Sequence, residues 1–227
     1  GNGTLTVMGT TSGTSGGTGD ERLVVNAGAG RVNFGGIYGA GTSAAASGLT
    51  EVVLTSSGAV TFDTIDIAGS LRQTTAATGN TVFNSDVSLD TADLKGTNYT
   101  LGEFLATGAV NISASGFVTQ TQGTRIAVAG LFDIGASTVT LNGASATGGV
   151  NLAVTGAATI HNDQDLSLSG SVGGDLAVVA TDRQIVQRPG TTLTLGRHSS
   201  FTGAGLQLPD LRSASTGIVT LDIANDA

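Results

Sequence analysis

Three groups of acidic residues are spaced closely enough to supply the paired carboxylates that carbohydrate-active enzymes use. In such a pair, one carboxyl protonates the leaving group while the other acts as base or nucleophile. These enzymes also place aromatic side chains beside the acids, but aromatic residues make up only 4% of this chain and Trp is absent. We therefore expect the acids to cap turns and keep the surface soluble, and we predict no catalytic residue. The groups are Asp63 with Asp66, Asp86 with Asp90 and Asp93, and Asp163 with Asp165.

A second candidate for chemistry is the run Asn162-Asp163-Gln164-Asp165, which places oxygen ligands within a short span. It lacks the glycine-anchored loop and the closing Glu of a dedicated calcium loop. The two histidines, His161 and His198, lie far apart and have no partners at the spacing of metal ligands. We interpret them as surface residues and predict no metal and no cofactor.

Positive charge gathers toward the C-terminal third, although the chain carries a formal net charge of −8. The acidic balance argues against nucleic acid as a partner, because phosphates require clustered Lys and Arg. The basic group is either a docking patch for a partner or an anionic glycan, or a solvated face that Asp182 and Asp210 balance. Its members are Arg183, Arg188, Arg197, His198 and Arg212.

A phrase of the form Gly-x-apolar-Thr/Asn-apolar recurs along the chain and indicates the elements that position these residues. Side chains alternate between the two faces of a strand, so the third and fifth positions face one way and the Thr or Asn between them faces the other. Each copy therefore predicts a strand with one apolar face. Copies begin at Gly3, Gly30, Gly58, Gly108, Ser137, Gly156, Thr191 and Gly217, and an out-of-phase copy begins at Gly79.

The spacing of these copies predicts a stacked repeat. The fifth positions of the first three copies, Val7, Phe34 and Phe62, are separated by nearly equal intervals. Helical periodicity is missing, and inside the chain Asn142-Gly143 is the only dipeptide of the type that tight antiparallel hairpins favour. We therefore predict an all-β fold, a right-handed parallel β-helix (β-solenoid) of about eight or nine coils, with residues 1–227 as a single segment of a longer repeat array.

Stacked coils would align the apolar positions of the phrase into two interior rows. Three stretches break the rhythm and are predicted to be irregular: 10–20, 36–48 and 95–105. The predicted rows are Leu5, Val32, Val60, Val110, Val139, Leu193 and Val219, and Val7, Phe34, Phe62, Ile112, Leu141, Leu195 and Leu221.

The Thr or Asn of each copy would form a polar ladder on the outside. Ice binding needs two adjacent, flat files of Thr, and pairs such as Thr138 and Thr140 supply them locally. Arg31, Ala59, Ala109 and Ile218 interrupt the companion file, so we expect Thr and Asn to be strand-surface residues that satisfy one another across coils. The predicted ladder is Thr6, Asn33, Thr61, Asn111, Thr140, Thr159, Thr194 and Thr220.

A second phrase ends in apolar-x-Gln and is followed by a turn, a strand and a Phe. It runs from Leu71-Arg72-Gln73 to Phe83, from Val118-Thr119-Gln120 to Phe132, and from Ile185-Val186-Gln187 to Phe201. Residues 22–225 resemble the repeats of filamentous-haemagglutinin-type exoproteins and the β-strand repeats of long bacterial surface proteins. The resemblance implies a β-helical shaft that is exported to the cell surface. The N-terminal secretion-domain signature of that family is missing, which implies an interior segment.

The function that we expect is therefore structural or adhesive, and not enzymatic. Its expected partners are flanking repeats or another subunit that continues the rod, and a glycan or protein of a host or neighbouring cell surface. We expect the segment to be extracellular or on the bacterial outer surface and not to span the membrane, because no apolar run approaches the ~20 residues of a spanning helix. The alternatives are a polysaccharide lyase or hydrolase and an ice-binding solenoid.

Overall fold

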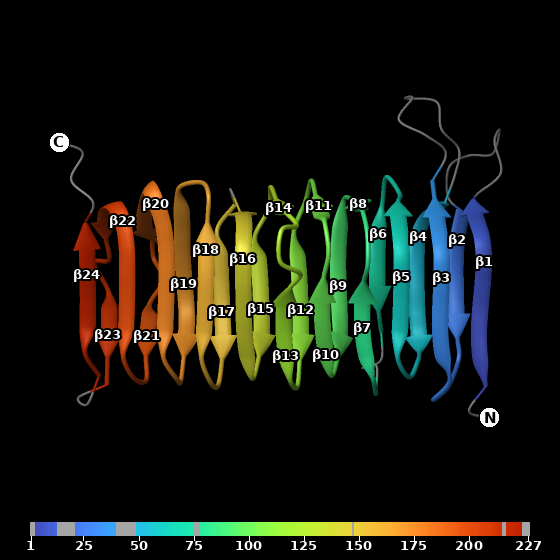
Figure 1. Cartoon of the computed structure of the whole chain (residues 1–227), viewed down its shortest axis with the longest axis horizontal. Coiled ribbons are helices and arrows are strands. Elements are labelled where there is room, and N and C mark those ends of the chain that lie inside the picture. Colours follow the sequence, from blue (N-terminus) through green and yellow to red (C-terminus); the bar gives the residue numbers. More distant parts are fainter. Residues whose placement is uncertain are drawn as a thin grey trace.

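The computed structural model shows an elongated coil of parallel strands, with the first and last strands at opposite ends (Figure 1). All 24 strands of the described residues belong to one sheet, every strand pair is parallel, and none of these residues lies in a helix that could cross a membrane. The predicted all-β parallel β-solenoid is confirmed. The structure describes residues 3–12, 21–39, 49–74, 78–146, 148–214 and 217–223.

One side of the coil is a stack of strands that we call the first stack. Each strand pairs in parallel with its equivalent in the next coil. In chain order, its members are β1 (Thr4–Ser12), β3 (Arg31–Tyr38), β5 (Val60–Asp66), β7 (Asn80–Phe83), β10 (Asn98–Leu101), β13 (Phe117–Gln120), β16 (Thr138–Ala146), β18 (Ala158–Asn162), β20 (Leu176–Gln187), β22 (Ser199–Gln207) and β24 (Val219–Ile223).

A second stack runs along another side, and short strands close the coil between the two. The second stack holds β2 (Glu21–Asn26), β4 (Leu49–Ser56), β6 (Ser70–Gln73), β9 (Thr91–Gly96), β12 (Val110–Ala114), β15 (Phe132–Ala136), β17 (Val150–Val154), β19 (Leu166–Val172), β21 (Leu193–Leu195) and β23 (Leu211–Ser213). The closing strands are β8 (Val87–Leu89), β11 (Phe104–Ala106) and β14 (Ile126–Val128), which pair in that order between the end of β5 and the end of β16.

Coil length changes along the rod. The register pairs Leu5 with Val32 across one of the long early coils, whereas it pairs Thr81 with Tyr99 across a coil that is about a third shorter. Because the later coils are shorter, the described strands of the first stack are linked by ten register steps from β1 to β24.

The predicted interior rows are confirmed where the coils have the predicted length, and four of their members are wrong. Leu5 pairs with Val32 and Val32 with Val60, so these three side chains form one row. The structure places four of the predicted members in the second stack, because shorter coils bring later copies of the phrase to the other side. They are Val110 and Ile112 on β12, and Leu193 and Leu195 on β21.

Phenyl rings occupy three consecutive positions of the interior row that begins with Val7. The ring centroids of Phe34 and Phe62 lie 5.3 Å apart, and those of Phe62 and Phe83 are also 5.3 Å apart, with the rings stacked. Phe104 meets Phe83 edge-on at 5.5 Å. The copy of the phrase at Gly79 is therefore in phase with the others, since Phe83 pairs with Phe62, and the out-of-phase prediction is wrong.

The prediction of an irregular stretch at 95–105 is also wrong. Lys95 lies in β9, Tyr99 lies in β10, and Phe104 begins β11, so the chain here makes three regular strands. In the other two stretches, 10–12 belong to β1 and 36–38 to β3. Residues 13–20 and 40–48 lie outside the described residues.

A buried polar group interrupts the apolar interior in the middle of the rod. Tyr99 and Thr81 are fully buried in the row that begins with Leu5, and Gln73 is 1% exposed. The Tyr99 hydroxyl donates to Gln73 Oε1, and Gln73 Nε2 donates to Thr81 Oγ1 at 3.3 Å. Burial raises the pKa of the Tyr99 phenol far above its ordinary value, and the negative charge of Asp93 acts in the same direction.

Glycines stand at the corners because successive coils leave no space for a side chain there. The amide of Gly130 donates to the carbonyl of Gly108 at 3.0 Å. A Cβ on Gly130 would lie 2.5 Å from the Gly108 carbonyl carbon, and a Cβ on Gly148 would lie 2.1 Å from the Gly130 oxygen. These contacts are with backbone, which cannot rotate away. The glycine content of the chain thus follows from coil stacking as well as from turns.

The corner contact predicts that Gly130→Ala destabilises the fold by about 1–3 kcal/mol, the usual cost of forcing extra atoms into a packed region. Gly135→Ala is the matched control, because its Cβ would meet nothing closer than the Ile112 oxygen at 3.8 Å. Urea unfolding of both variants measures the difference. Equal stability of the two variants would contradict tight stacking at this corner.

The buried phenol predicts a loss of stability at high pH. The unfolded phenol ionises above about pH 10, whereas the folded phenol stays protonated. The contribution of Tyr99 to the free energy of unfolding is thus complete below about pH 10 and declines by about 1.4 kcal/mol per pH unit above it. Urea titrations at rising pH should show this decline in the wild type relative to Tyr99→Phe. A constant difference between the two proteins would refute it.

Candidate functional site: side-chain ladders and two surface grooves

The candidate acids do not act as free pairs, because four of them accept a hydrogen bond from the next coil. A carboxylate that accepts a bond from an adjacent coil joins the two windings. These bonds run from Asn84 Nδ2 to Asp63 Oδ1 (2.9 Å), from Thr107 Oγ1 to Asp90 Oδ1 (2.8 Å), from Asn111 Nδ2 to Asp93 Oδ1 (3.2 Å) and from the Gln184 amide to Asp165 Oδ1 (2.9 Å).

Asp66, Asp86 and Asp163 are held through their backbones. The carbonyl of Asp86 accepts from the amide of Ile65 at 2.9 Å, and that of Asp66 accepts from the amide of Gly39. The amide of Asp163 donates to the carbonyl of Ala144, in the preceding coil, at 3.0 Å. The sequence predicted turn-capping and surface roles for these acids. The bonds that the structure shows run mainly between coils, with partners too distant in sequence to be recognised beforehand.

An alternating row of carboxylates and amides runs along the outside of the second stack, and we call it the Asp/Asn ladder. It comprises Asp93, Asn111, Asp133, Asn151 and Ser169, which pair in register from β9 to β19. Asn151 Nδ2 donates to Asp133 Oδ1, and Ser169 Oγ donates to Asn151 Oδ1, each at 2.9 Å. The prediction that Asn111 belongs to the polar ladder of the first phrase is therefore wrong. The signal that sequence reasoning missed is that Asn111 follows Asp93, and Asn151 follows Asp133, at the same interval.

The outside of the first stack carries the predicted polar ladder, with two members replaced. We call it the threonine row. Asn111 and Thr194 are absent from it because both lie in the second stack. The row comprises Thr6, Asn33, Thr61, Val82, Thr100, Thr119, Thr140, Thr159, Ala177, Ser200 and Thr220.

The row beside it, on neighbouring positions of the same strands, is chemically mixed. Thr4 pairs with Arg31, Asn98 pairs with Asn80, and Phe117 pairs with Thr138. Asn98 bridges its neighbours, since its Nδ2 donates to Asn80 Oδ1 and its Oδ1 accepts from the Phe117 amide, both at 2.9 Å. The paired flat files of Thr that ice binding requires are therefore not continuous over these coils.

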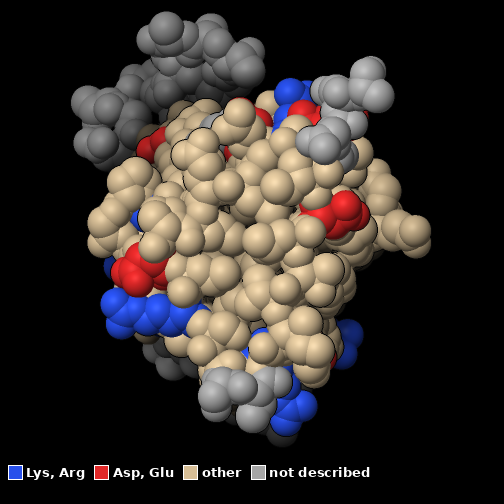
Figure 2. All heavy atoms as spheres, turned by 90° about the vertical axis from the view of Figure 1, so that its left-hand side faces the viewer, with Lys and Arg blue, Asp and Glu red and all other residues tan. Residues whose placement is uncertain are grey.

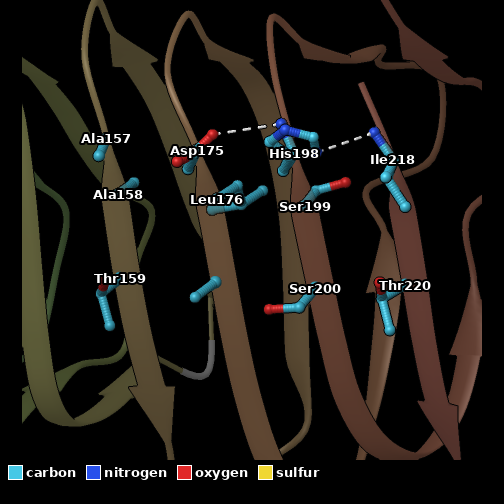
Figure 3. Close-up of a pocket in the computed structure, with 11 residues that line it drawn as sticks. Ala157, Ala158, Thr159, Asp175, Leu176, His198, Ser199, Ser200, Ile218 and Thr220 are labelled. Carbon is cyan, nitrogen blue, oxygen red and sulfur yellow. Dashed lines mark hydrogen bonds between the residues drawn. The ribbon is translucent and has the colours of Figure 1, made fainter. Parts of the chain in front are cut away.

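A shallow groove of about 370 Å³, which we call groove A, lies over β18, β20, β22 and β24 (Figure 3). His198 is exposed and joins two coils there: its amide donates to Asp175 Oδ1 at 3.2 Å, and its Nδ1 accepts from the Ile218 amide at 3.3 Å. The other lining residues are mostly small or aliphatic, among them Ala157 and Leu176. His198 is thus a surface residue with a structural bond, in keeping with its predicted exposure.

A second groove of about 320 Å³, groove B, brings together residues that were considered separately. Its lining includes His161, Asp163, Asp182 and Arg183. Arg183 Nε donates to the carbonyl of Asp163 at 3.1 Å, so the guanidinium is fixed beside the run 162–165. Asp182 has a φ of 57°, a left-handed conformation that is uncommon for residues other than glycine. Of these two grooves, groove B is the one whose lining includes both Asp and Arg.

The predicted basic group is spread over several parts of the coil. Arg183 lines groove B and His198 lines groove A, whereas Arg212 lies on β23 of the second stack. Arg212 Nε bonds Asp210 Oδ1 at 3.1 Å. Hydrogen bonds from Arg212 and Thr192 hold the pKa of the Asp210 carboxyl below its usual range.

Two of the three glutamines of the second phrase, Gln120 and Gln187, are buried and make the same set of hydrogen bonds, which we call a clamp. The sequence did not predict this role. Gln120 Nε2 donates to the carbonyls of Thr124 (2.7 Å), in its own turn, and Gly143 (3.2 Å), in the next coil. Gln120 Oε1 accepts from the amides of Asn142 (2.8 Å) and Gly143 (3.0 Å). The clamp therefore holds its own turn and the strand of the next coil.

Gln187 repeats this pattern at the same spacings. Its Nε2 donates to the carbonyls of Thr191 and Asp210, and its Oε1 accepts from the Asp210 amide at 2.8 Å. Both clamps enclose a turn whose third residue, Gly123 or Gly190, has a positive φ. The shared sequence Gln-x-x-Gly-Thr was the available signal.

Comparison with known protein families, curated proteins and solved structures finds no match to this chain. Within the described ranges, no three His, Asp or Glu side chains gather in a way that could hold a metal ion.

The clamp predicts that Gln120→Leu lowers the free energy of unfolding by about 1–3 kcal/mol, because the amides and carbonyls that it binds lose a buried partner. Gln122→Leu makes the same chemical change on an exposed residue of the adjoining turn and should stay within about 0.5 kcal/mol of the wild type. Thermal and urea unfolding of both variants provide the comparison. A similar loss in both would mean that the clamp contributes nothing specific.

Proposed function

We propose that this chain is a structural, adhesive shaft segment of a bacterial cell-surface or extracellular fibre, similar to the β-helical repeats of filamentous-haemagglutinin-like exoproteins. It acts through length, stiffness and a polar side face, and it catalyses no reaction. The observation that carries the proposal is the use of outward polar groups as links between coils. Side chains that bind the neighbouring coil strengthen the rod and are not free to meet a substrate.

The dimensions of the coil support a spacer role. Ten register steps at about 4.8 Å per strand spacing give a stack about 48 Å long. Parallel pairing along its whole length, with apolar rows inside, makes bending costly because any bend would open backbone hydrogen bonds and separate packed side chains. Such a segment holds the two ends of a fibre at a fixed distance from each other.

The alternative is a carbohydrate-active β-helix enzyme, and groove B is the observation that favours it. His161, Asp163 and Arg183 line this groove beside Asp182, whose backbone is strained. Strained residues often mark functional sites. Against this alternative, the groove is shallow and open, and Arg183 already bonds a backbone carbonyl.

A further alternative is ice binding, for which the threonine row is the relevant surface. Thr100, Thr119, Thr140 and Thr159 follow one another in register on four successive coils. Thermal hysteresis of the purified protein decides this alternative directly.

The shaft proposal predicts that antibodies against the chain label intact source cells or extracellular fibres, and that the purified protein leaves polysaccharides unchanged. The screen should include uronate-containing and neutral polysaccharides, with reducing ends and unsaturated products measured. Labelling only after cells are permeabilised would refute the surface role. Turnover that is lost in Asp163→Asn and Arg183→Gln would establish the enzyme alternative.

A further inference from the structure

The two ends of the coil each present a strand that is paired on one side only. Among the described residues, β1 pairs with β3 alone and β24 pairs with β22 alone. An edge strand of this kind is a template for another strand, since its outer amides and carbonyls are without a ladder. The two edges belong to the same stack and run in the same direction along the coil.

The same two ends expose apolar side chains that are buried at equivalent positions elsewhere. Phe201 is fully buried, whereas Leu221, its partner on the terminal strand, is 54% exposed. Ile223 is 48% exposed on the same strand. At the other end, Leu5 is 43% exposed, while Val32, its partner, is fully buried. One more winding against either end would bury these groups.

Figure 2 looks at the end formed by β24, and uncharged residues occupy most of the face, with charged residues toward its rim. This distribution resembles the core and rim of a protein interface. It also means that another coil could approach without desolvating many charges.

We propose that copies of this chain associate head to tail, with β1 of one copy adding in parallel to β24 of another. The register that continues the interior rows places Leu5 on Val219 and Val7 on Leu221. It also places Thr6 on Thr220, which extends the threonine row across the junction. Both strands carry the same phrase, Gly3-Thr4-Leu5-Thr6-Val7 and Gly217-Ile218-Val219-Thr220-Leu221, so the two inward positions pair apolar with apolar and the outward position between them pairs Thr with Thr.

A second copy of the chain is the occupant that the structure favours, because one chain carries both complementary edges. The contact joins two different surfaces, so each added copy leaves one edge of each kind open. Association therefore produces open linear assemblies and not closed dimers. This property belongs to the coil ends and goes beyond the proposed shaft function, since it holds whether or not the protein is on a cell surface.

The test uses one variant blocked at each end. Leu221→Asp blocks the C-terminal edge, and Leu5→Asp blocks the N-terminal edge. Leu105→Asp is the control, because Leu105 is an exposed leucine on β11, in the middle of the rod. Light scattering after size exclusion measures the mass at rising concentration, and circular dichroism with thermal melting verifies that each variant is folded. Should either variant fail to fold, Val7→Asp and Ile223→Asp, on the same two edge strands, replace the pair.

The wild type and Leu105→Asp should grow with concentration to multiples of 22.2 kDa, and electron microscopy should show linear rods. Each blocked variant should lose this growth and remain at 22.2 kDa. An equimolar mixture of the two should give a species of twice 22.2 kDa, because each supplies the edge that the other lacks.

Four results would overturn the proposal. The first is a wild type that stays monomeric at millimolar concentration, which would assign the end faces to flanking coils of a longer chain. The second is dimerisation of one blocked variant by itself, which would indicate a contact between like ends. The third is a mixture without the heterodimer. The fourth is an equal loss of association in Leu105→Asp, which would reveal a general effect of added charge.

Discussion

Parallel hydrogen bonding between one coil and the next is the interaction on which the rest of this structure depends. It sets each residue directly over its counterpart and thereby imposes a rule on every position of the winding. An inward position must be apolar over apolar, as Phe34 is over Phe62, or it must find a buried polar partner, as Tyr99 finds Gln73. A corner where backbones touch admits only glycine.

The outward positions obey the same rule with a different chemistry. Asp over Asn and Thr over Thr give bonds or compatible surfaces without a charge facing a like charge. In the Asp/Asn ladder, an amide separates Asp93 from Asp133, so the two carboxylates are not adjacent. The acidic character of the chain is thus distributed between coils in a way that links them.

Sequence periodicity predicted the fold because the phrase at Gly3, Gly30 and Gly58 repeats at nearly constant intervals and each copy is a strand. It failed in the middle of the chain, where shorter coils moved Val110 and Ile112 to the second stack. Local patterns report which face of a strand is apolar but not which side of the coil the strand occupies. The candidate acids could be recognised from their close spacing in the sequence. Their hydrogen-bond partners could not, because each lies a full winding away. The clamps of Gln120 and Gln187 were likewise hidden, since their second partner lies in the next coil.

The stacking of equivalent strands in successive windings has an evolutionary consequence. A deletion of one residue inside a strand reverses the faces of that strand, whereas removal or duplication of an entire winding leaves every row aligned across the new join. Genes of this type can therefore lengthen or shorten their product by whole units through recombination, without the compensating substitutions that a globular core would need. Selection on the length of the rod can then proceed separately from selection on its ability to fold.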